Sequence, residues 1–292
     1  MSSGGSGTSV GAVVVTMNDR PEGFAQALDS LLAQEGVELD VVVVGNGHVP
    51  GSIPAGVRTI GVPKNIGVQE GRNLGAAEVN GDYLFFFDDG THLPVPDTLL
   101  RLATAFDQDP RLAYAQPRTC DPITGLTLRR WVPRLRASAP TRPGVVTFMA
   151  EGPVMVRRYA YELAGGWPKH FLLSHEEMDL AWRLWELGHH GRYLPDIIVH
   201  HPATATARPA TLHRLNARNR VWTARRNLPR PLIPLHLATW SLITLCRLRE
   251  GKALRACLAG FREGLAGGHG ARQPMSWKTV YRLSRAGRPP IL

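Results

Sequence analysis

Short apolar runs alternate with helical patterns through the first hundred residues, and this alternation constrains the fold more than any other feature. The runs are rich in valine and aromatic residues, which is typical of strands buried on both faces of a sheet. Segments with apolar side chains at helical spacing, such as residues 19–32 and 67–79, separate the runs. Strands that alternate with helices form a mostly parallel sheet, so the sequence predicts a Rossmann-like α/β fold with helices on both faces. The expected strands are residues 11–16, 40–44, 57–62 and 83–87.

The rest of the chain divides into an irregular middle and a helical end. Residues 121–143 form a loop-rich, arginine-rich insert of the kind that often shapes a binding site. We expect a disordered Gly/Ser-rich start over residues 1–9, a main domain over 10–210, and a basic and apolar helical extension over 211–292. The remaining expected elements are helices at 96–106, 158–164, 176–187, 212–227, 232–248 and 254–265, and strands at 111–117, 145–149, 153–156 and 197–199.

The formal net charge of +10, supplied mostly by arginine, favours anionic partners such as nucleotides or an acidic membrane surface. The basic helix at 212–227 lacks a nucleic-acid-binding motif, so we do not expect nucleic acid and favour a solvated face or contact with lipid headgroups. The apolar segment 232–248 is shorter than the roughly 20 residues that span a bilayer. It fits either an interfacial element or a helix packed on the protein. Three cysteines without metal or redox spacing favour a reduced, cytoplasmic protein.

Two adjacent carboxylates, Asp88 and Asp89, end the aromatic strand 83–87. The carboxyl ends of parallel strands form the edge at which open α/β sheets bind ligands. Neighbouring carboxylates repel each other, and hard oxygen ligands suit Mg²⁺ or Mn²⁺. The pair therefore predicts a cation site, with a simple solvated turn as the alternative.

Three other segments carry groups that could do chemistry. Residues 175–179 gather three acids and a histidine at a helix start, where they could supply a general base or merely cap the helix. His200 and His201 follow a short strand and could ligate Mn²⁺. Residues 65–75 form a glycine-bearing turn into a helix, which offers backbone amides and Arg72 to an anion or merely packs closely on the sheet.

Taken in chain order, these segments resemble an inverting family 2 glycosyltransferase with the GT-A fold, of the bacterial type, over roughly residues 10–227. The matching segments are 15–20 at the first strand, 65–75 with its Asn-x-Gly and Arg-Asn-x-Gly pattern, 87–89 in place of the metal-binding DxD, 152 and 165–167 on the acceptor side, 176–183, 195–201 and 218–220. The resemblance implies a nucleotide-sugar-binding half over 10–100 and an acceptor half over 101–210.

The resemblance also implies a role for each group. Asp89 would bind Mn²⁺ or Mg²⁺ at the donor diphosphate, and Asp88 would contact the ribose or help to hold the metal. His200 would be a further metal ligand, with His201 as the second choice. The general base would be Glu177, and Glu176 or Asp179 could share its task. The donor would also contact Thr16, Asn18, Arg20, Asn46, Asn65 and Arg72, and the acceptor would contact Gly152, Trp167 and His175.

The sequence departs from the family pattern at three positions. Gly45 stands where members usually carry an Asp that contacts the nucleotide base, and the neighbouring Asn46 is the candidate substitute for that contact. Phe87 replaces the first acid of the DxD motif, and Glu177 replaces the more usual Asp at the base position. The extra methylene displaces that carboxylate by roughly 1.5 Å.

The function implied is metal-dependent, inverting transfer of a sugar from a nucleotide-diphosphate sugar to an acceptor hydroxyl. The acceptor would be a polysaccharide, a lipid-linked precursor or a small natural product, its recognition set by the 121–143 insert and the loop before Glu176. A sugar-nucleotidyltransferase is one alternative, although residues 16–19 lack its Gly-rich loop. An inactive glycosyltransferase-like binding protein is the other. Peripheral contact with the inner face of an anionic membrane and a homo-oligomer are further expectations.

Overall fold

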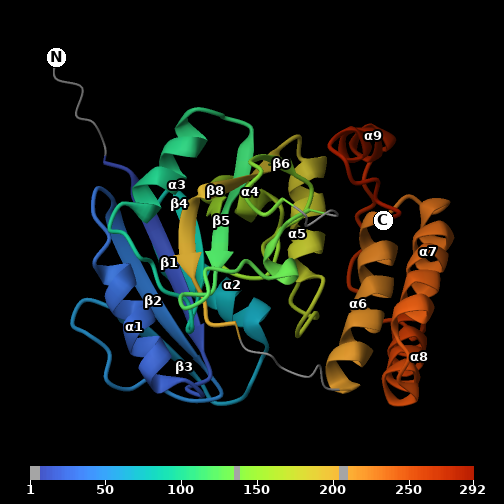
Figure 1. Cartoon of the computed structure of the whole chain (residues 1–292), viewed down its shortest axis with the longest axis horizontal. Coiled ribbons are helices and arrows are strands. Elements are labelled where there is room, and N and C mark those ends of the chain that lie inside the picture. The colour runs from blue at the N-terminus through green and yellow to red at the C-terminus, as the bar shows by residue number, and fades with distance from the viewer. Residues whose placement is uncertain (1–6, 135–138, 204–209) are drawn as a thin grey trace.

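A single mixed sheet organises the chain. The computed structural model describes residues 7–134, 139–203 and 210–292. Within these ranges eight strands form one sheet in the order β3-β2-β1-β4-β7-β5-β8-β6, visible at the centre of Figure 1. The strands are β1 (Ser9–Thr16), β2 (Glu38–Asn46), β3 (Arg58–Val62), β4 (Tyr83–Asp88), β5 (Leu112–Cys120), β6 (Gly144–Val146), β7 (Val154–Arg157) and β8 (His190–His200).

Strand direction decides which residues meet at one edge of the sheet. β1 is parallel to β2 and β4, and β2 is parallel to β3. β7 runs antiparallel to both β4 and β5, so β5 again has the direction of β4, and β8 is parallel to β5. The carboxyl ends of β1, β2, β4, β5 and β8 therefore lie at the same edge, which is the expected ligand-binding edge of an α/β sheet.

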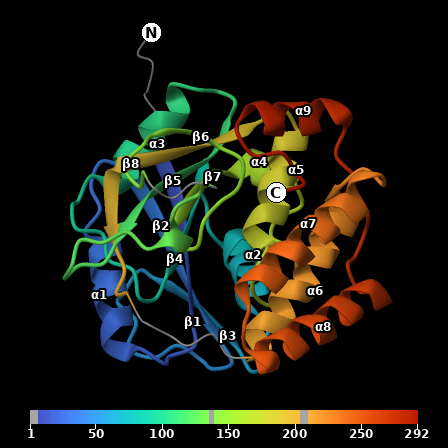
Figure 2. The same cartoon turned by 45° about the vertical axis from the view of Figure 1, so that its right-hand side comes forward.

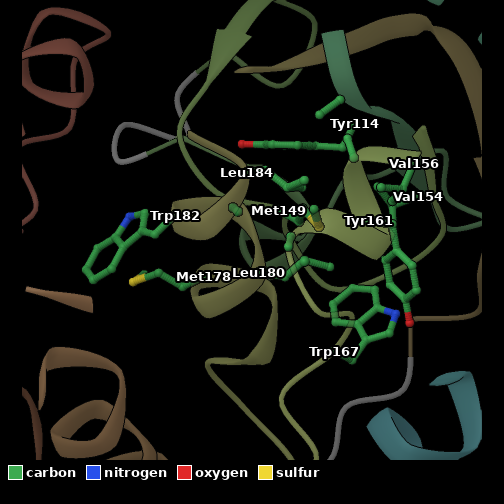
Figure 3. Packing of buried hydrophobic residues seen from close by; sticks show 14 of the residues in the cluster. Tyr114, Met149, Val154, Val156, Tyr161, Trp167, Met178, Leu180, Trp182 and Leu184 are labelled. Atoms are coloured by element: carbon green, nitrogen blue, oxygen red, sulfur yellow. The ribbon is translucent and has the colours of Figure 1, made fainter. Parts of the chain in front are cut away.

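Helices cover both faces because every buried strand carries apolar side chains on both sides. On one face, Val14 and Phe85 pack with α1 (Pro21–Leu32) and α3 (Thr98–Asp107). On the other face, Val13 and Phe86 pack with α2 (Val68–Glu78), α4 (Arg158–Leu163) and α5 (Glu176–Glu186). Figure 3 shows part of this second core, in which Leu180 and Leu184 of α5 belong to the same cluster as Tyr114 and Val156 of the sheet. The predicted α/β class with helices on both faces is confirmed.

The C-terminal region packs against the α5 side of the sheet domain (Figure 2). It contains α6 (Ala210–Asn227), α7 (Leu232–Arg247), α8 (Gly251–Ala266) and α9 (Trp277–Arg285). Helix α6 lies between α5 and α8, and α9 touches α5. The helical extension is confirmed, and its apolar segment forms α7, which packs on α6. Contact of this segment with a membrane stays a prediction. No helix in the described ranges combines the length and apolar character that crossing a bilayer requires.

The arginines of α6 do not form the solvated face that was expected. Arg214 and Arg218 both donate to the carboxylate of Glu263 on α8, at 2.7 and 3.0 Å. Arg225 donates to main-chain oxygens at the end of α8, and Arg226 pairs with Asp179 on α5. These arginines form hydrogen bonds and ion pairs with groups on neighbouring helices. The residue pattern along α6 alone does not reveal such partners.

Three other expectations about the elements need correction. The predicted start of 1–9 is too long, because β1 begins at Ser9 and the Thr8 carbonyl accepts a hydrogen bond from Glu38 N at 2.8 Å; residues 1–6 lie outside the described ranges. β8 spans eleven residues instead of 197–199, since Pro195 sits at a register irregularity that interrupts the sequence pattern without ending the strand. Helix α9 was missed, although the Ser276 hydroxyl caps it through Thr279 N.

Two glycines let α8 approach α6 closely. A Cβ on Gly260 would clash with the main-chain oxygen of Arg214, and one on Gly264 would stand 2.7 Å from the Cβ of Val221. We expect Gly260→Ala to lower the free energy of unfolding by roughly 1–3 kcal/mol, because two helix backbones must separate. Urea denaturation followed by circular dichroism measures the change.

Gly251→Ala is the matched control, since a Cβ there meets no described atom within 4 Å. It should leave stability unchanged or raise it slightly through helix propensity. Equal stability of the Gly260→Ala chain and the wild type would show that the two helices are not held in close contact.

Candidate active site

The acid pair lies at the carboxyl end of β4, beside the end of β1. The register that pairs Val15 with Asp88 brings the next residues together, and Thr16 Oγ1 donates to Asp89 Oδ2 at 2.9 Å. The same hydroxyl accepts from the backbone N–H of Asn18 at 3.0 Å, which fixes the turn after β1 with Asn18 at φ +58°. Thr16, Asn18, Asp88 and Asp89 are thus brought together as the sequence predicted.

Arg72 holds the other carboxylate of the pair. Its Nη2 donates to Asp88 Oδ1 at 2.9 Å, and its guanidinium lies 4.9 Å from the ring centroid of Trp167. Trp167 is only 1% exposed and packs edge-on against Phe86. It was expected to contact an acceptor, but burial makes it part of the core, where it positions Arg72.

Asn46, at the end of β2, and Asn65 hold the turn before α2 through hydrogen bonds. Asn46 Oδ1 accepts from Ile66 N at 2.8 Å, and its Nδ2 donates to Asn65 Oδ1 at 3.0 Å. Asn65 Oδ1 also accepts from Gly67 N. Asn46 is 2% exposed and both ends of its amide are bonded to this turn, so the structure assigns it a supporting role.

The space beside Gly45 explains the missing family Asp. A Cβ at this position would lie 2.5 Å from the His48 carbonyl oxygen and within 2.8 Å of the Pro50 ring. The turn after β2 therefore fills the volume that a side chain would need. A nucleotide base at this edge must be held by other groups.

The two histidines at the end of β8 point to different surroundings. His200 pairs with His92 through two backbone hydrogen bonds of 2.8 Å, and their rings stack at 6.0 Å. His201 Nε2 lies 3.4 Å from the place of a Cβ on Gly90, and Arg20 Nη1 lies 3.1 Å from the same point. His201 Nδ1 is 2.9 Å from the carbonyl oxygen of Pro202. Because a carbonyl oxygen can only accept, a neutral His201 ring in this hydrogen bond carries its hydrogen on Nδ1, and Nε2 has a free lone pair. The structure thus favours His201, the second choice, over His200 as the histidine beside the acid pair.

The residues at this edge fit a divalent cation that brings other ligands with it. Burial raises the pKa of Asp89, and the nearby carboxylates of Asp88 and Asp19 raise it further, so a cation there would relieve an electrostatic cost. In the described part of the chain no three His, Cys, Asp or Glu side chains converge as ligands. Asp89 and His201 could supply one oxygen and one imidazole nitrogen, with phosphate oxygens and water as the remainder. Such a set suits Mn²⁺.

A second group of residues surrounds a cavity of 380 Å³ at the N-terminus of α5. Part of its wall comes from the insert and from the loop before α5, as the sequence predicted, and part from the C-terminal helices. Its lining includes Arg129, Arg130, Val132, Phe148, Glu151, Leu173, Ser174, His175, Glu176, Glu177, Leu212, Asn216, Arg220, Trp240 and Arg288.

The two glutamates of this cavity hold their protons unusually tightly. Burial raises the pKa of Glu176 from 4.5 to about 7. Burial and the adjacent Glu176 carboxylate raise the pKa of Glu177 well above its ordinary value. The positive charge of Arg72, whose guanidinium pairs with Asp88, partly offsets both pKa shifts. A carboxylate with a pKa near 7 is matched to proton transfer at neutral pH.

Asp179, the third acid of the cluster, is not available as a base. It is fully buried, and its Oδ2 pairs with Arg183 at 2.7 Å. Its Oδ1 accepts from Arg226 at 2.8 Å and from Asn227 at 2.7 Å. Although burial alone would raise its pKa, the two guanidiniums hold that pKa below the ordinary value. Asp179 ties α5 to α6 instead.

The two remaining acceptor-side candidates border the cavity. His175 lines it in a left-handed conformation, φ +70°, and burial together with Arg220 and His236 pushes its pKa well below 6.5, so it is neutral. Gly152 follows the lining residue Glu151, and a Cβ there would lie 3.1 Å from Thr119 Oγ1.

Sequence reasoning missed the basic groups that the C-terminal helices bring to this cavity. Arg220 lies in the 218–220 segment, which was noted only as a family resemblance, and Arg288 carried no signal at all. They reach the site through tertiary packing. Neither hydrophobic periodicity nor a local sequence motif indicates such residues.

Comparison with known proteins agrees with this geometry. Residues 12–164, just over half of the 292-residue chain, match the model of the family described as Glycosyl transferase family 2. No curated protein matches the chain in sequence.

Three solved structures are similar over most of the chain. One is GalNAc-T7 with UDP, GalNAc and Mn²⁺ (TM-score 0.64, 14% identity, 96% of this chain and 57% of that one). A second is the mannosyltransferase PcManGT from Pyrobaculum calidifontis with GDP-Man and Mn²⁺ (0.55, 16%, 94% and 78%). A third is TarS 1-349 from S. aureus (0.59, 13%, 88% and 81%). The chain thus spans little more than half the length of the first, and it shares the GT-A fold with these proteins.

The raised pKa of Glu176 gives a testable pH dependence. Between pH 4.5 and about 7 the folded chain binds more protons at Glu176 than the unfolded chain, so the free energy of unfolding falls as pH rises through this window. We expect Glu176→Gln to reduce that fall by on the order of 1–3 kcal/mol. Denaturant titrations at several pH values measure it.

Glu78→Gln is the control, because Glu78 is exposed at the end of α2. Its pH profile should follow that of the wild type. A Glu176→Gln profile parallel to the wild type would contradict the raised pKa.

Proposed function

Because the match over residues 12–164 shows that this chain belongs to glycosyl transferase family 2, we propose that it transfers a sugar from a nucleotide-diphosphate sugar to an acceptor hydroxyl by a metal-dependent, inverting reaction. The observation that carries the proposal is the arrangement around Arg72. Its guanidinium pairs with Asp88 on the donor side and acts on the paired glutamates of the cavity. One guanidinium would thus act both on the groups proposed for the leaving anion and on the groups proposed for the proton.

The donor would bind along the edge formed by β1, β2 and β4. Asp89 and His201 would hold Mn²⁺ or Mg²⁺ there, and the bound cation would supply neutralisation of the charge on the leaving diphosphate. Arg20, like His201, lies close to Gly90, and it would add a second positive charge for phosphate oxygens. GalNAc-T7 with UDP and Mn²⁺ and PcManGT with GDP-Man and Mn²⁺ support this assignment by likeness of fold.

The acceptor would enter the cavity at the N-terminus of α5. Its hydroxyl oxygen attacks the anomeric carbon from the face opposite the diphosphate, the carbon–oxygen bond to the diphosphate breaks, and Glu177 takes the hydroxyl proton. One displacement inverts the configuration at the anomeric carbon. Glu177 is the more accessible of the pair, whereas Glu176 is only 3% exposed and raises the pKa of its neighbour.

The departures from the family pattern do not remove groups from this site. Phe87 is 1% exposed within the α1-side core, so this position faces away from the ligand edge. Gly45 faces the turn that fills its side-chain space. The argument that these positions mark an inactive binding protein is thereby weakened, and no observation favours a sugar-nucleotidyltransferase.

Replacing the base is the direct test of catalysis. We expect Glu177→Gln to slow hydrolysis of the donor by roughly 10²–10⁴-fold, because the amide that replaces the more accessible carboxylate of the pair cannot accept the proton of the attacking oxygen. Release of nucleoside diphosphate measures the rate with UDP- and GDP-sugars. Glu162→Gln, at a carboxylate that is 61% exposed on α4, should keep the wild-type rate. Undiminished turnover in Glu177→Gln would remove Glu177 from the base role.

Binding of nucleotide tests the metal site independently of turnover. We expect Asp89→Asn to weaken Mn²⁺-dependent binding of UDP or GDP at least tenfold, since it removes a charged oxygen ligand. Isothermal titration calorimetry with and without MnCl₂ measures the difference. Asp97→Asn, at an exposed residue before α3, is the control. Equal Mn²⁺ dependence in Asp89→Asn and wild type would contradict the assignment.

A further inference from the structure

The three helices α6, α7 and α8 enclose an apolar groove of 380 Å³. Most of its lining is aliphatic or aromatic, and its polar groups come from α6 (His213, Asn216 and Arg220) and from α7 (Ser241, Thr244 and Arg247). Leu245 and Leu258 belong to the lining and are still 56% and 51% exposed, so the groove opens to the surface through apolar side chains. An apolar concavity of this volume is large enough for part of a small ligand.

This groove adjoins the cavity at the N-terminus of α5. Four residues line both: Leu212, Asn216, Arg220 and Trp240. The side chains of one short stretch of α6 and of Trp240 thus face the groove as well as the space that contains Glu176 and Glu177.

A cation stands at the junction of groove and cavity. The guanidinium of Arg220 lies 3.9 Å from the ring centroid of Trp240, and its Nη1 is buried without a hydrogen-bond partner among the described residues. Burial, and then the charge of Arg288, lowers the pKa of Arg220 to about 9. No ion pair to Arg220 occurs in the described ranges. A partly buried guanidinium with an unpaired buried N–H group and no carboxylate partner in the described ranges favours an anionic ligand.

We propose that the acceptor is an amphiphile, a single-chain lipid phosphate whose apolar chain lies in the α6–α8 groove and whose phosphate lies at Arg220. The reacting hydroxyl would belong to the part of the headgroup that extends into the cavity toward Glu177. The assignment of that hydroxyl rests on the proposed glycosyl transfer, whereas the binding of chain and phosphate does not. The lining that the groove shares with the cavity and the charge complementarity at Arg220 favour this occupant over a second copy of the chain.

Soluble alkyl phosphates test the assignment with the full chain. Hexyl, octyl and decyl phosphate, each below its micelle concentration, should bind with affinity that rises by up to about fourfold per methylene until the groove is filled. Decyl glucoside, which lacks the charge, should bind at least tenfold more weakly than decyl phosphate, and inorganic phosphate should not bind measurably. Isothermal titration calorimetry provides all of these values.

Two variants separate the two halves of the site. Leu245→Asp should flatten the dependence on chain length, and Arg220→Gln should abolish the preference for phosphate over glucoside while keeping that dependence. Leu242→Asp is the matched control, because Leu242 is 64% exposed on the same helix and does not line the groove. It should bind like the wild type.

Several results would overturn the proposal. Affinity independent of chain length, or equal losses in Leu242→Asp and Leu245→Asp, would show that the groove does not take the chain. Binding of phosphatidylglycerol vesicles without binding of alkyl phosphates would make the groove a membrane contact. Self-association that Leu245→Asp abolishes, again without alkyl phosphate binding, would make it a dimer interface. Mn²⁺-dependent binding of UDP or GDP is measured alongside, so failure of the donor assignment remains distinct from failure of the acceptor assignment.

Discussion

The buried carboxylate of Asp179 is the interaction on which the arrangement of this molecule depends. It accepts hydrogen bonds from Arg183 on its own helix and from Arg226 and Asn227 on α6, and solvent does not reach it. A buried charge is tolerated only when its partners are complete, so the sheet domain and the C-terminal helices must meet in one register. Asp179 lies two residues after Glu177 on the same helix, and this register therefore also sets where the Glu177 carboxylate lies.

The sheet supplies the other half of the site through strand direction alone. β1, β4 and β8 end at one edge, which brings Thr16, Asp89 and His201 together from three distant parts of the sequence. The C-terminal helices form part of the wall of the cavity at the N-terminus of α5. The proposed donor would therefore be held by the sheet edge, and the proposed acceptor partly by the C-terminal helices. Arg72 is the residue common to both.

Sequence reasoning predicted most of the sheet domain because buried strands carry an uninterrupted apolar signal, as at Val41–Val44 and Tyr83–Phe87. It also singled out Asp89 at the end of a strand and Arg72 after a glycine-bearing turn, whereas the family resemblance singled out Glu177. It left Asp179 as a residue that could share the task of Glu177, since adjacent acids look alike until their partners on α6 are known. Trp167, Asn46 and the arginines of α6 were misjudged for the same reason: burial and pairing arise from contacts between distant segments, which no local pattern records.

The shared position of Arg72 makes the two ends of the site communicate through charge. Its guanidinium pairs with Asp88 and favours the ionised forms of Glu176 and Glu177, so its influence on the glutamates depends on how far Asp88 neutralises it. An anion that arrives beside Arg72 makes Glu176 and Glu177 bind their protons more tightly, and loss of that anion releases them. Because such coupling is reciprocal, the proton affinity of Glu176 and Glu177 depends on whether an anion is bound beside Arg72.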